Sequence, residues 1–306
     1  MAIVTADYLA GVFTNFKALF TQELTGVNLD WSKVATEMPS DTDLETYNWL
    51  GEFPRMRAWK GSKIVKDLFT HNYSIKNYDY ELTIGVSRNT FEDNKLGLEK
   101  ARISGMARAA GEYVDYLVFS QLADALSTCY DGQLFYDTDH SEGNSGTQSN
   151  KSTSALSATT LKAGLLAMRK FKNDQGLSLD IVADTLVVPP DLEDTALELT
   201  KSQLLLVSGL ASTSSASYAP DMNILSQRGL TVLCKAILPE TDHWFLLSTK
   251  GVVKPVLLQV RKPNTFVALD QPTAENVFWR KEYNYGVEAR YGCGYGLWQY
   301  AYGGIV

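Results

Sequence analysis

The sequence predicts an α+β protein whose helices and strands form an elongated element rather than a compact body with a cleft. Apolar residues keep a helical period from residue 98 to residue 129 without a proline, and at 1.5 Å per residue such a helix is roughly 45–50 Å long. Apolar and polar residues alternate over 78–86 and again over 277–291, which is typical of long strands. A rod helix beside strands of similar length suits a plate that packs against copies of itself.

The N-terminal part predicts an arm rather than an independent domain. Residues 3–24 have the apolar spacing of one amphipathic helix, and a polar, irregular stretch follows to about residue 40. This segment has little core of its own, so we expect it to lie on another part of the molecule.

The segment 59–88 predicts a long hairpin or a pair of ribbons. Two-stranded ribbons are only marginally stable in water, and their unpaired edges favour pairing with another chain. Basic residues gather at the base of this segment, and tyrosines follow along it. The candidate subunit contacts are Arg55, Arg57, Trp59, Lys60, Lys63, Lys66, Tyr73, Tyr78 and Tyr80.

The second half of the chain predicts shorter elements separated by polar loops. Residues 141–157 are almost wholly Ser, Thr, Gly and Asn, which predicts a solvated loop. The expected elements after it are a helix over 159–172, strands over 186–188, 230–236 and 243–249, and one long strand over 277–291.

The composition excludes several classes of protein. The chain has 306 residues, 45% of them hydrophobic, which is ordinary for a globular protein. A net charge of −7 gives no electrostatic footprint for gripping phosphates, so sequence-specific nucleic-acid binding is disfavoured. Three widely spaced cysteines argue against a disulfide framework and fit a reducing cytosol. We expect neither a signal peptide nor a membrane span.

The stretch CYDGQLFYDTDH, residues 129–140, concentrates the chemically reactive side chains. In a hydrolase or a metalloprotein, the site would use Cys129, Asp137, Asp139 and His140. However, zinc sites use several Cys or His ligands, and a calcium loop needs oxygen ligands that continue to a bidentate Glu. Here the chain runs into SEGNSG instead.

We favour a structural turn for this stretch. Tyr130 and Phe135 are expected to anchor the turn after the long helix. Asp137, Asp139 and His140 are expected to bond the local backbone, as polar side chains in turns commonly do. No catalytic set, metal site or cofactor site is therefore predicted.

Four stretches resemble the major head (capsid) subunits of Mu-like tailed phages. They are TYNWLGEFPRMRAWKG at 46–61, YSIKNYDYELTIGVSRNTFEDNKLG at 73–97, CYDGQLFYDTDH at 129–140 and TLVVPPDLEDTALEL at 185–199. They follow one another in the order and spacing of that family. The resemblance implies the Hong Kong 97-like capsid fold that tailed phages and herpesviruses share.

The resemblance also implies a division of the chain into named parts. These are an N-arm (1–56), an E-loop hairpin (57–90), a P domain (91–157) with a spine helix (98–129) and the Ser/Thr-rich loop, an A domain (158–236), P-domain strands (237–285) and an A-domain C-terminal strand (286–306).

By the same resemblance, the protein is a major capsid protein and not an enzyme. Its copies would form hexamers and pentamers of an icosahedral head that encloses double-stranded DNA without sequence-specific binding. No lysine, asparagine and glutamate match the crosslinking trio of some members, so we predict non-covalent assembly. The chain starts directly at the N-arm, which implies a separate scaffold protein. A portal and a decoration protein are further expected partners, and the virion, assembled in the host cytoplasm, is the expected location. The alternatives are the hydrolase or metalloprotein above and a related encapsulating shell protein.

Overall fold

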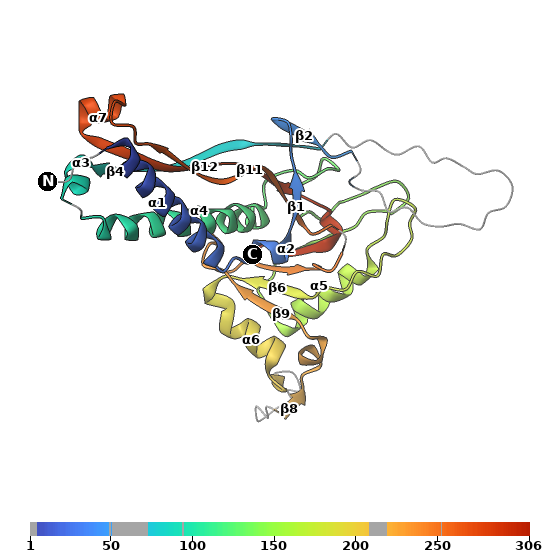
Figure 1. Ribbon diagram of the computed structural model, residues 1–306. Coiled ribbons are helices and arrows are strands. Elements are labelled where there is room, and N and C mark those ends of the chain that lie inside the picture. Colours follow the sequence, from blue (N-terminus) through green and yellow to red (C-terminus); the bar gives the residue numbers. More distant parts are fainter. Residues whose placement is uncertain (1–4, 49, 51–72, 94, 208–218, 252) are drawn as a thin grey trace.

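Two β-sheets organise the computed structural model, which describes residues 5–48, 50, 73–93, 95–207, 219–251 and 253–306. A long four-stranded sheet forms an arm, and a shorter five-stranded sheet lies in a body that narrows towards strand β8 (Figure 1). None of the helices in the described part of the chain is both long and apolar enough to cross a membrane.

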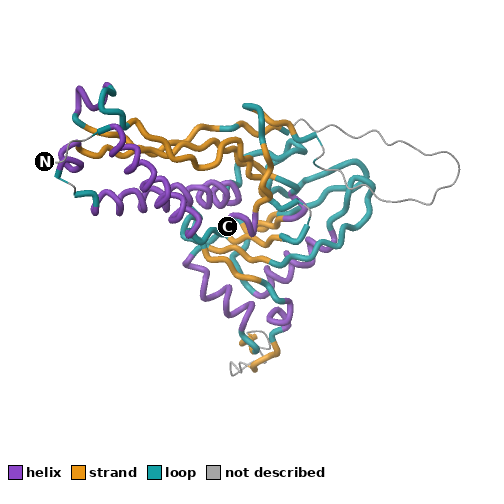
Figure 2. The backbone as a smooth tube through the Cα atoms, in the orientation of Figure 1, coloured by secondary structure: helices purple, strands orange, loops and turns teal. Residues whose placement is uncertain are grey.

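The arm sheet has the strand order β1-β11-β12-β4. Its strands are β1 (Ala35–Pro39), β4 (Tyr78–Ser87), β11 (Val256–Leu269) and β12 (Glu282–Tyr295). The two central strands have 14 residues each and pair antiparallel along their length, so each spans roughly 45 Å. Two helices, α1 (Ala6–Gly26) and α4 (Gly97–Ala123), run along this sheet (Figure 2).

Apolar residues at helical spacing hold α1 and α4 against the sheet. Phe16 of α1 meets Tyr285 edge-on at 5.2 Å between ring centroids, and Phe20 lies 5.3 Å from Phe266. Ile103 and Met106 of α4 are buried in the same cluster. The N-terminal helix therefore rests on the rest of the chain, as its small core predicts, because its apolar stripe has no other surface to cover.

The body sheet has the strand order β5-β13-β10-β6-β9. Its strands are β5 (Lys151–Ser152), β6 (Thr185–Val188), β9 (Thr231–Cys234), β10 (Trp244–Leu247) and β13 (Ala301–Gly304). All four residues of β6 are buried. Helix α5 (Ala158–Lys170) begins at a capping box, in which Ser157 and Thr160 each satisfy the other's backbone N–H.

The remaining elements are short. They are α2 (Trp31–Val34), β2 (Leu44–Thr46), β3 (Ser74–Lys76), α3 (Arg88–Glu92), η1 (Pro190–Leu192), α6 (Glu193–Lys201), β7 (Leu204–Val207), β8 (Ala219–Met222), η2 (Ile224–Arg228), α7 (Glu275–Arg280) and η3 (Trp298–Tyr300).

The long helix ends earlier than predicted. It stops at Ala123 rather than at Cys129, because Asp124 adopts an extended backbone and its carboxylate accepts the N–H of Leu126 at 2.9 Å. Such a local side-chain bond competes with the helical hydrogen bond. Residues up to Cys129 therefore belong to the turn, which the apolar spacing alone could not indicate.

The predicted strand over 277–291 is wrong in its first part. Its first residues form α7, and Lys281, with φ of 53°, reverses the chain into β12. Phe278 and Lys281 are the positions that break the alternation, and both precede the strand. A short amphipathic helix and a strand can share such a pattern over a few residues.

The predicted solvated loop over 141–157 is also wrong in part. Glu142, Ser145, Asn150 and Leu156 are buried, and Lys151 and Ser152 form β5 beside β13. The small polar residues of this segment are held by hydrogen bonds to the body rather than by an apolar core, so the composition predicted exposure.

The predicted hairpin over 59–88 lies partly outside the described residues, which begin again at Tyr73. In the described part, β4 pairs with β12 of the same chain from Tyr78 opposite Tyr291 to Ser87 opposite Glu282. Strand β3 pairs with β2.

The division into named parts remains a prediction, and two strands do not follow it. Strand β12 passes the expected boundary at residue 286 and stays in the arm sheet to Tyr295. Strand β10, inside the expected P-domain segment 237–285, lies between β13 and β6 of the body sheet.

Candidate functional site

The turn that follows α4 is fixed by two fully buried aromatic rings. Phe135 stacks on Tyr295 at the end of β12, with ring centroids 4.0 Å apart and ring planes at 6°. The Tyr136 hydroxyl donates to the carbonyl of Leu122 at 3.1 Å. Tyr130 and Cys129 are buried as well. The turn therefore joins the end of α4 to the end of the central arm strand.

His140 is fully buried and bonds side chains rather than the local backbone, so the expectation for this residue was wrong. Its Nδ1 lies 2.6 Å from Oδ2 of Asp131, and its Nε2 lies 3.2 Å from Oδ1 of Asn150. The ring stacks on Trp298 with centroids 4.2 Å apart. Asn150 is oriented by its Nδ2, which donates to the carbonyl of Phe135 at 2.8 Å.

Asp131 holds this cluster together and was missed at the sequence level. Its Oδ1 accepts the Cys129 thiol at 2.8 Å and the N–H of Gln133 at 3.1 Å. Burial alone would raise the pKa of Asp131, but the hydrogen bonds from His140 and Cys129 outweigh burial and lower it. Asp131 looked like one more polar residue of a turn, and only the fold brings His140 to it.

The metal or hydrolase alternative needs Cys129, Asp137, Asp139 and His140 together, and the structure does not place them so. Asp137 accepts the N–H of Thr138 at 2.7 Å, as expected for a turn, and Asp139 is exposed. Within the described residues, one group of three possible ligand atoms lies within 4.8 Å of one another. These atoms come from Cys129, Asp131 and His140.

This group fits a metal poorly. It offers three ligand atoms, whereas structural zinc uses four, and its thiol and imidazole both bond the same carboxylate. Burial and the neighbouring Asp131 carboxylate raise the pKa of the Cys129 thiol far above its usual value. Because the thiolate is the nucleophile and the metal ligand, this shift disfavours both roles for Cys129.

A second buried network connects Glu142 to the C-terminal residues. Its carboxylate accepts the indole N–H of Trp298 at 2.9 Å and the side-chain N–H of Gln299 at 3.2 Å. The Tyr130 hydroxyl donates to the same oxygen. Burial raises the pKa of Tyr130 well above its usual value, so this phenol stays protonated and can donate. Nothing in the Ser/Gly-rich sequence around Glu142 signals this role.

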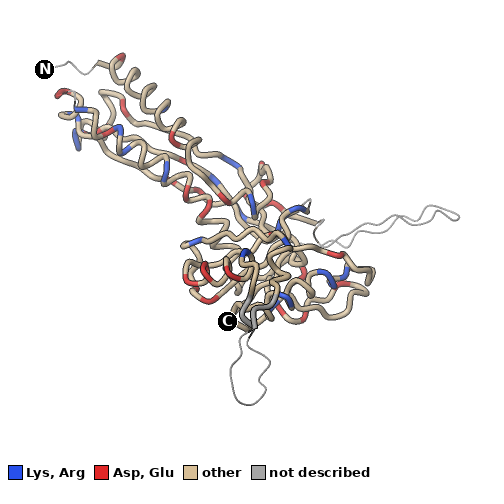
Figure 3. Tube along the Cα trace, turned by 90° about the horizontal axis from the view of Figure 1, so that it is seen from below, with Lys and Arg blue, Asp and Glu red and all other residues tan. Residues whose placement is uncertain are grey.

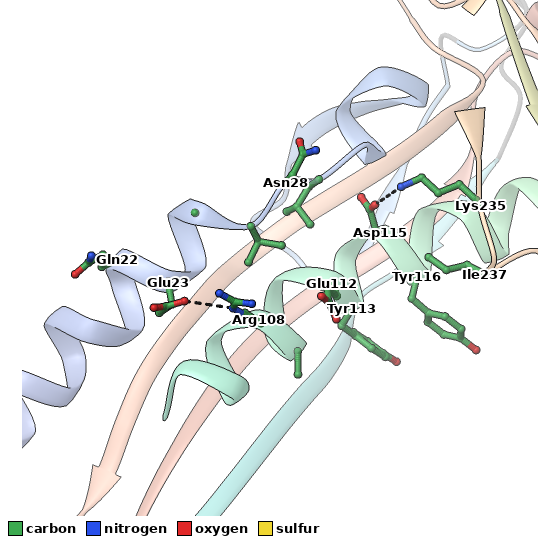
Figure 4. A pocket seen from close by; sticks show the side chains of 14 residues that line it. Gln22, Glu23, Asn28, Arg108, Glu112, Tyr113, Asp115, Tyr116, Lys235 and Ile237 are labelled. Carbon is green, nitrogen blue, oxygen red and sulfur yellow. Dashed lines mark hydrogen bonds and ion pairs between the residues drawn. The ribbon is translucent and has the colours of Figure 1, made fainter. Parts of the chain in front are cut away.

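A third polar cluster ties the N-terminal segment, α4 and the body together (Figure 4). Buried Asp115 accepts the backbone N–H of Asp30 at 3.0 Å and of Trp31 at 2.7 Å. Lys235 lies 2.9 Å from Asp115 and 2.7 Å from Asp30. Burial would lower the pKa of Lys235, but these two carboxylates raise it. The lysine therefore stays charged and is suited to fastening, not to proton abstraction.

Asp115 and Lys235 border a groove of about 860 Å³ between α1 and α4. Glu23 of α1 and Arg108 of α4 form an ion pair across it at 3.3 Å. Both cations of the lining, Arg108 and Lys235, therefore already have carboxylate partners.

Three of the predicted subunit contacts lie in the described residues. The Tyr73 hydroxyl accepts the N–H of Tyr295 at 2.8 Å, and the Tyr80 ring lies 5.0 Å from that of Tyr113. Tyr78 is 56% exposed. Tyr73 and Tyr80 thus make contacts within the chain. The other predicted contacts, Arg55, Arg57, Trp59, Lys60, Lys63 and Lys66, lie outside the described residues.

The most exposed aromatic pair was missed because its segment was assigned to a strand. Phe278 and Trp279 of α7 are 77% and 73% exposed and touch each other edge-on. They lie at the far end of the arm (Figure 1). Exposed apolar patches of this kind mark contact sites.

Comparison with known proteins identifies the family. The chain matches the family model of the Mu-like prophage major head subunit gpT over residues 9–155, 150–219 and 232–304. It is 27% identical over 303 residues to the Mu-like prophage FluMu major head subunit of Haemophilus influenzae, which covers 99% of this chain and 74% of that protein. It is 26% identical over 300 residues to the major capsid protein of Escherichia phage Mu, which covers 98% of this chain and 74% of that protein.

The fold agrees with a solved capsid. The chain superposes on a subunit of the procapsid of bacteriophage JBD30 with a TM-score of 0.61 and 27% identity, covering 98% of this chain and 75% of that one. The Hong Kong 97-like fold expected from the sequence is thereby confirmed. These relatives are structural shell proteins and not enzymes. Because the matched segments together span most of its length, this chain belongs to the family of Mu-like prophage major head subunits.

Proposed function

We propose that copies of this protein assemble non-covalently into hexamers and pentamers that form the icosahedral head of a tailed phage around double-stranded DNA. The observation that carries the proposal is the family match along most of the chain. The long arm and tapering body support it, because subunits of this form can overlap and surround an axis. Closed rings require heterologous contacts, in which one surface of a copy meets a different surface of the next.

The charge of the chain supports a container for DNA rather than a DNA-binding protein. With a net charge of −7, the shell does not hold phosphates by bulk attraction. Packed DNA would therefore stay free to enter and leave.

The proposal includes partners. A separate scaffold protein and a portal would act during assembly in the host cytoplasm, and a decoration protein would bind the finished head. The mature location is the virion. The resemblance of the sequence to Mu-like head subunits is the support for these partners.

Co-expression with the scaffold protein of the same phage tests the proposal. We expect closed shells in electron micrographs and a fast-sedimenting species, with fewer regular shells when the scaffold is omitted. A protein that remains monomeric under all conditions contradicts the proposal.

The metalloprotein alternative is tested on the same material. It requires bound metal that Asp137→Asn and His140→Asn remove while shells still form. We expect metal content below one ion per chain in the wild-type shells.

A further inference from the structure

A groove with an apolar floor and a basic rim lies between α5 and η2. Its volume is about 370 Å³, and its lining includes Leu165, Val182 and Ile224 with the two arginines Arg169 and Arg228. Val182 and Ile224 are 51% and 59% exposed. The groove therefore exposes apolar surface beside two positive charges, and its described lining holds no carboxylate.

The two arginines make little electrostatic contact with the part of the chain that the structure describes. Among the residues that the structure describes, Arg228 forms no ion pair. Arg169 has a long contact of 3.9 Å with Asp180, whose side chain is 76% exposed. Such an exposed pair contributes little. Both guanidinium groups are thus free to meet carboxylates of another molecule.

Helix α6 exposes a stripe of the opposite charge. Asp194, Leu197 and Glu198 are exposed, whereas Ala196 and Leu199 are buried against the body. Positions 194, 197 and 198 lie on one face of a helix, since residues three and four apart are neighbours. The stripe is therefore one apolar side chain between two carboxylates, which complements an apolar floor between two arginines.

The groove and the stripe lie on different flanks of the body. Figure 1 shows α6 on one side of the tapering body and α5 on the other. Seen from below, acidic residues gather on the α6 side, and basic residues are frequent on the α5 side (Figure 3). Helix α5 contains Lys162, Arg169 and Lys170 and no acidic residue. One copy cannot bring its own two surfaces together, but neighbouring copies around an axis can.

We propose that the acidic stripe of α6 in one copy docks into the α5–η2 groove of the next copy around each ring. Leu197 enters the apolar groove, and Asp194 and Glu198 pair with Arg169 and Arg228. The contact is heterologous, so it generates rings when the rotation closes. This inference rests on the proposed assembly into hexamers and pentamers and names the surfaces that hold them.

Charge reversal tests the contact directly. Arg228→Glu and Glu198→Arg each place like charges together, so we expect each variant to lose about tenfold or more of its rings and shells. The doubly substituted chain, with Arg228→Glu and Glu198→Arg together, regains assembly. Lys170→Glu on α5 and Glu240→Arg are the matched controls, because both positions are exposed and neither lines the groove. Native mass spectrometry and electron microscopy measure the yields.

Mixing the two single variants gives a sharper test. The stripe of each variant then matches the groove of the other variant and repels its own, so the two variants must alternate around a ring. A ring of alternating copies closes with six copies but not with five, because five is an odd number. We expect hexamers without complete icosahedral shells from the mixture, and each variant alone should give about a tenth or less of the wild-type yield of rings.

The outcomes separate this inference from the proposed function. If the wild-type chain forms no rings, the proposed function fails. If the wild-type chain forms shells and both single reversals do so at wild-type yield, the docking contact is wrong while the shell function stands. Urea unfolding confirms that each variant is folded. Leu197→Ser is the second variant at this contact, and it must also reduce ring yield without changing the unfolding midpoint.

Discussion

The two ends of the central strand β12 carry aromatic clusters in opposite surroundings. At the body end, Phe135 is fully buried and stacks on Tyr295. At the arm end, Phe278 and Trp279 of α7 contact each other and are otherwise largely exposed. Buried rings contribute to folding because water is removed from them in the subunit. Exposed rings contribute nothing comparable until another molecule covers them, so the two clusters separate folding from assembly.

The polar groups around the two clusters differ in the same way. In the body, the His140 ring bonds Asp131, and Glu142 accepts the indole N–H of Trp298, so these buried polar groups have partners. The exposed cluster lies beside Glu275 and Arg280 on the surface of α7. An unpaired charge is costly when it is buried in the body and costs little on the exposed surface of α7. Substitutions at the two ends should therefore affect different measurements.

The largest expected effect is at Phe135. Phe135→Ala removes a fully buried ring and leaves a cavity, so we expect a loss of about 3–5 kcal/mol in the free energy of unfolding. Urea unfolding followed by circular dichroism measures it, and shell yield should fall with it. Phe135→Leu is the control and should lose less. A loss below about 1 kcal/mol would show that the site collapses without the ring.

Asp131→Asn should have the next largest effect on stability. Removing the carboxylate leaves His140 without its partner in a buried site, which costs about 3 kcal/mol. The pKa of Asp131 is lowered on folding from 3.8, so its stabilisation is complete above that value and is lost as the pH falls. The unfolding midpoint of the wild type should therefore decline in acid more steeply than that of Asp131→Asn. Equal pH profiles would contradict the pairing.

The elements with a clear local pattern were predicted, and the polar clusters were not. The helices at 3–24 and 159–172 and the buried strand at 186–188 agree with α1, α5 and β6 to within a few residues. Their apolar spacing and caps are local properties. In contrast, Asp131 owes its role to His140, and Glu142 owes its role to Trp298. Only the fold brings these partners together.

The predicted ends of two elements were wrong for a related reason. The apolar pattern of the long helix continues beyond Ala123, but Asp124 bonds the backbone of its own turn and stops the helix. Near residue 281 the pattern fits a strand, yet a residue with positive φ separates helix from strand. Apolar periodicity indicates which face of an element is apolar, but it does not indicate at which residue the element ends.

Lys235→Met tests the connection between the body, α4 and the N-terminal segment. It removes the cation that joins Asp115 of α4 to Asp30 of the N-terminal segment. Asp115 keeps two backbone donors, so we expect a moderate loss of about 1–2 kcal/mol. Hydrogen exchange should rise at Asp30 and Trp31. Lys250→Met is the control, and equal exchange in both variants would contradict the role of Lys235.

Trp279→Ser should leave the subunit stable and reduce its assembly. The ring is 73% exposed, so the free energy of unfolding should change by less than about 0.5 kcal/mol. Shell yield in the presence of scaffold should fall, because exposed apolar patches mark contact sites. A normal yield would mean that the arm end does not take part in assembly.

Asp139→Asn should have the smallest effect of all. Asp139 lies in the most chemically suggestive stretch of the sequence, yet it is exposed, whereas Phe135 four residues earlier is fully buried. We expect changes within about 0.5 kcal/mol in unfolding free energy, with shell yield and metal content unchanged. The comparison with Phe135→Ala is decisive, because a structural turn depends on its rings and a chemical site depends on its carboxylates. If Asp139→Asn harmed assembly more than Phe135→Ala, this turn would have to be regarded as a site after all.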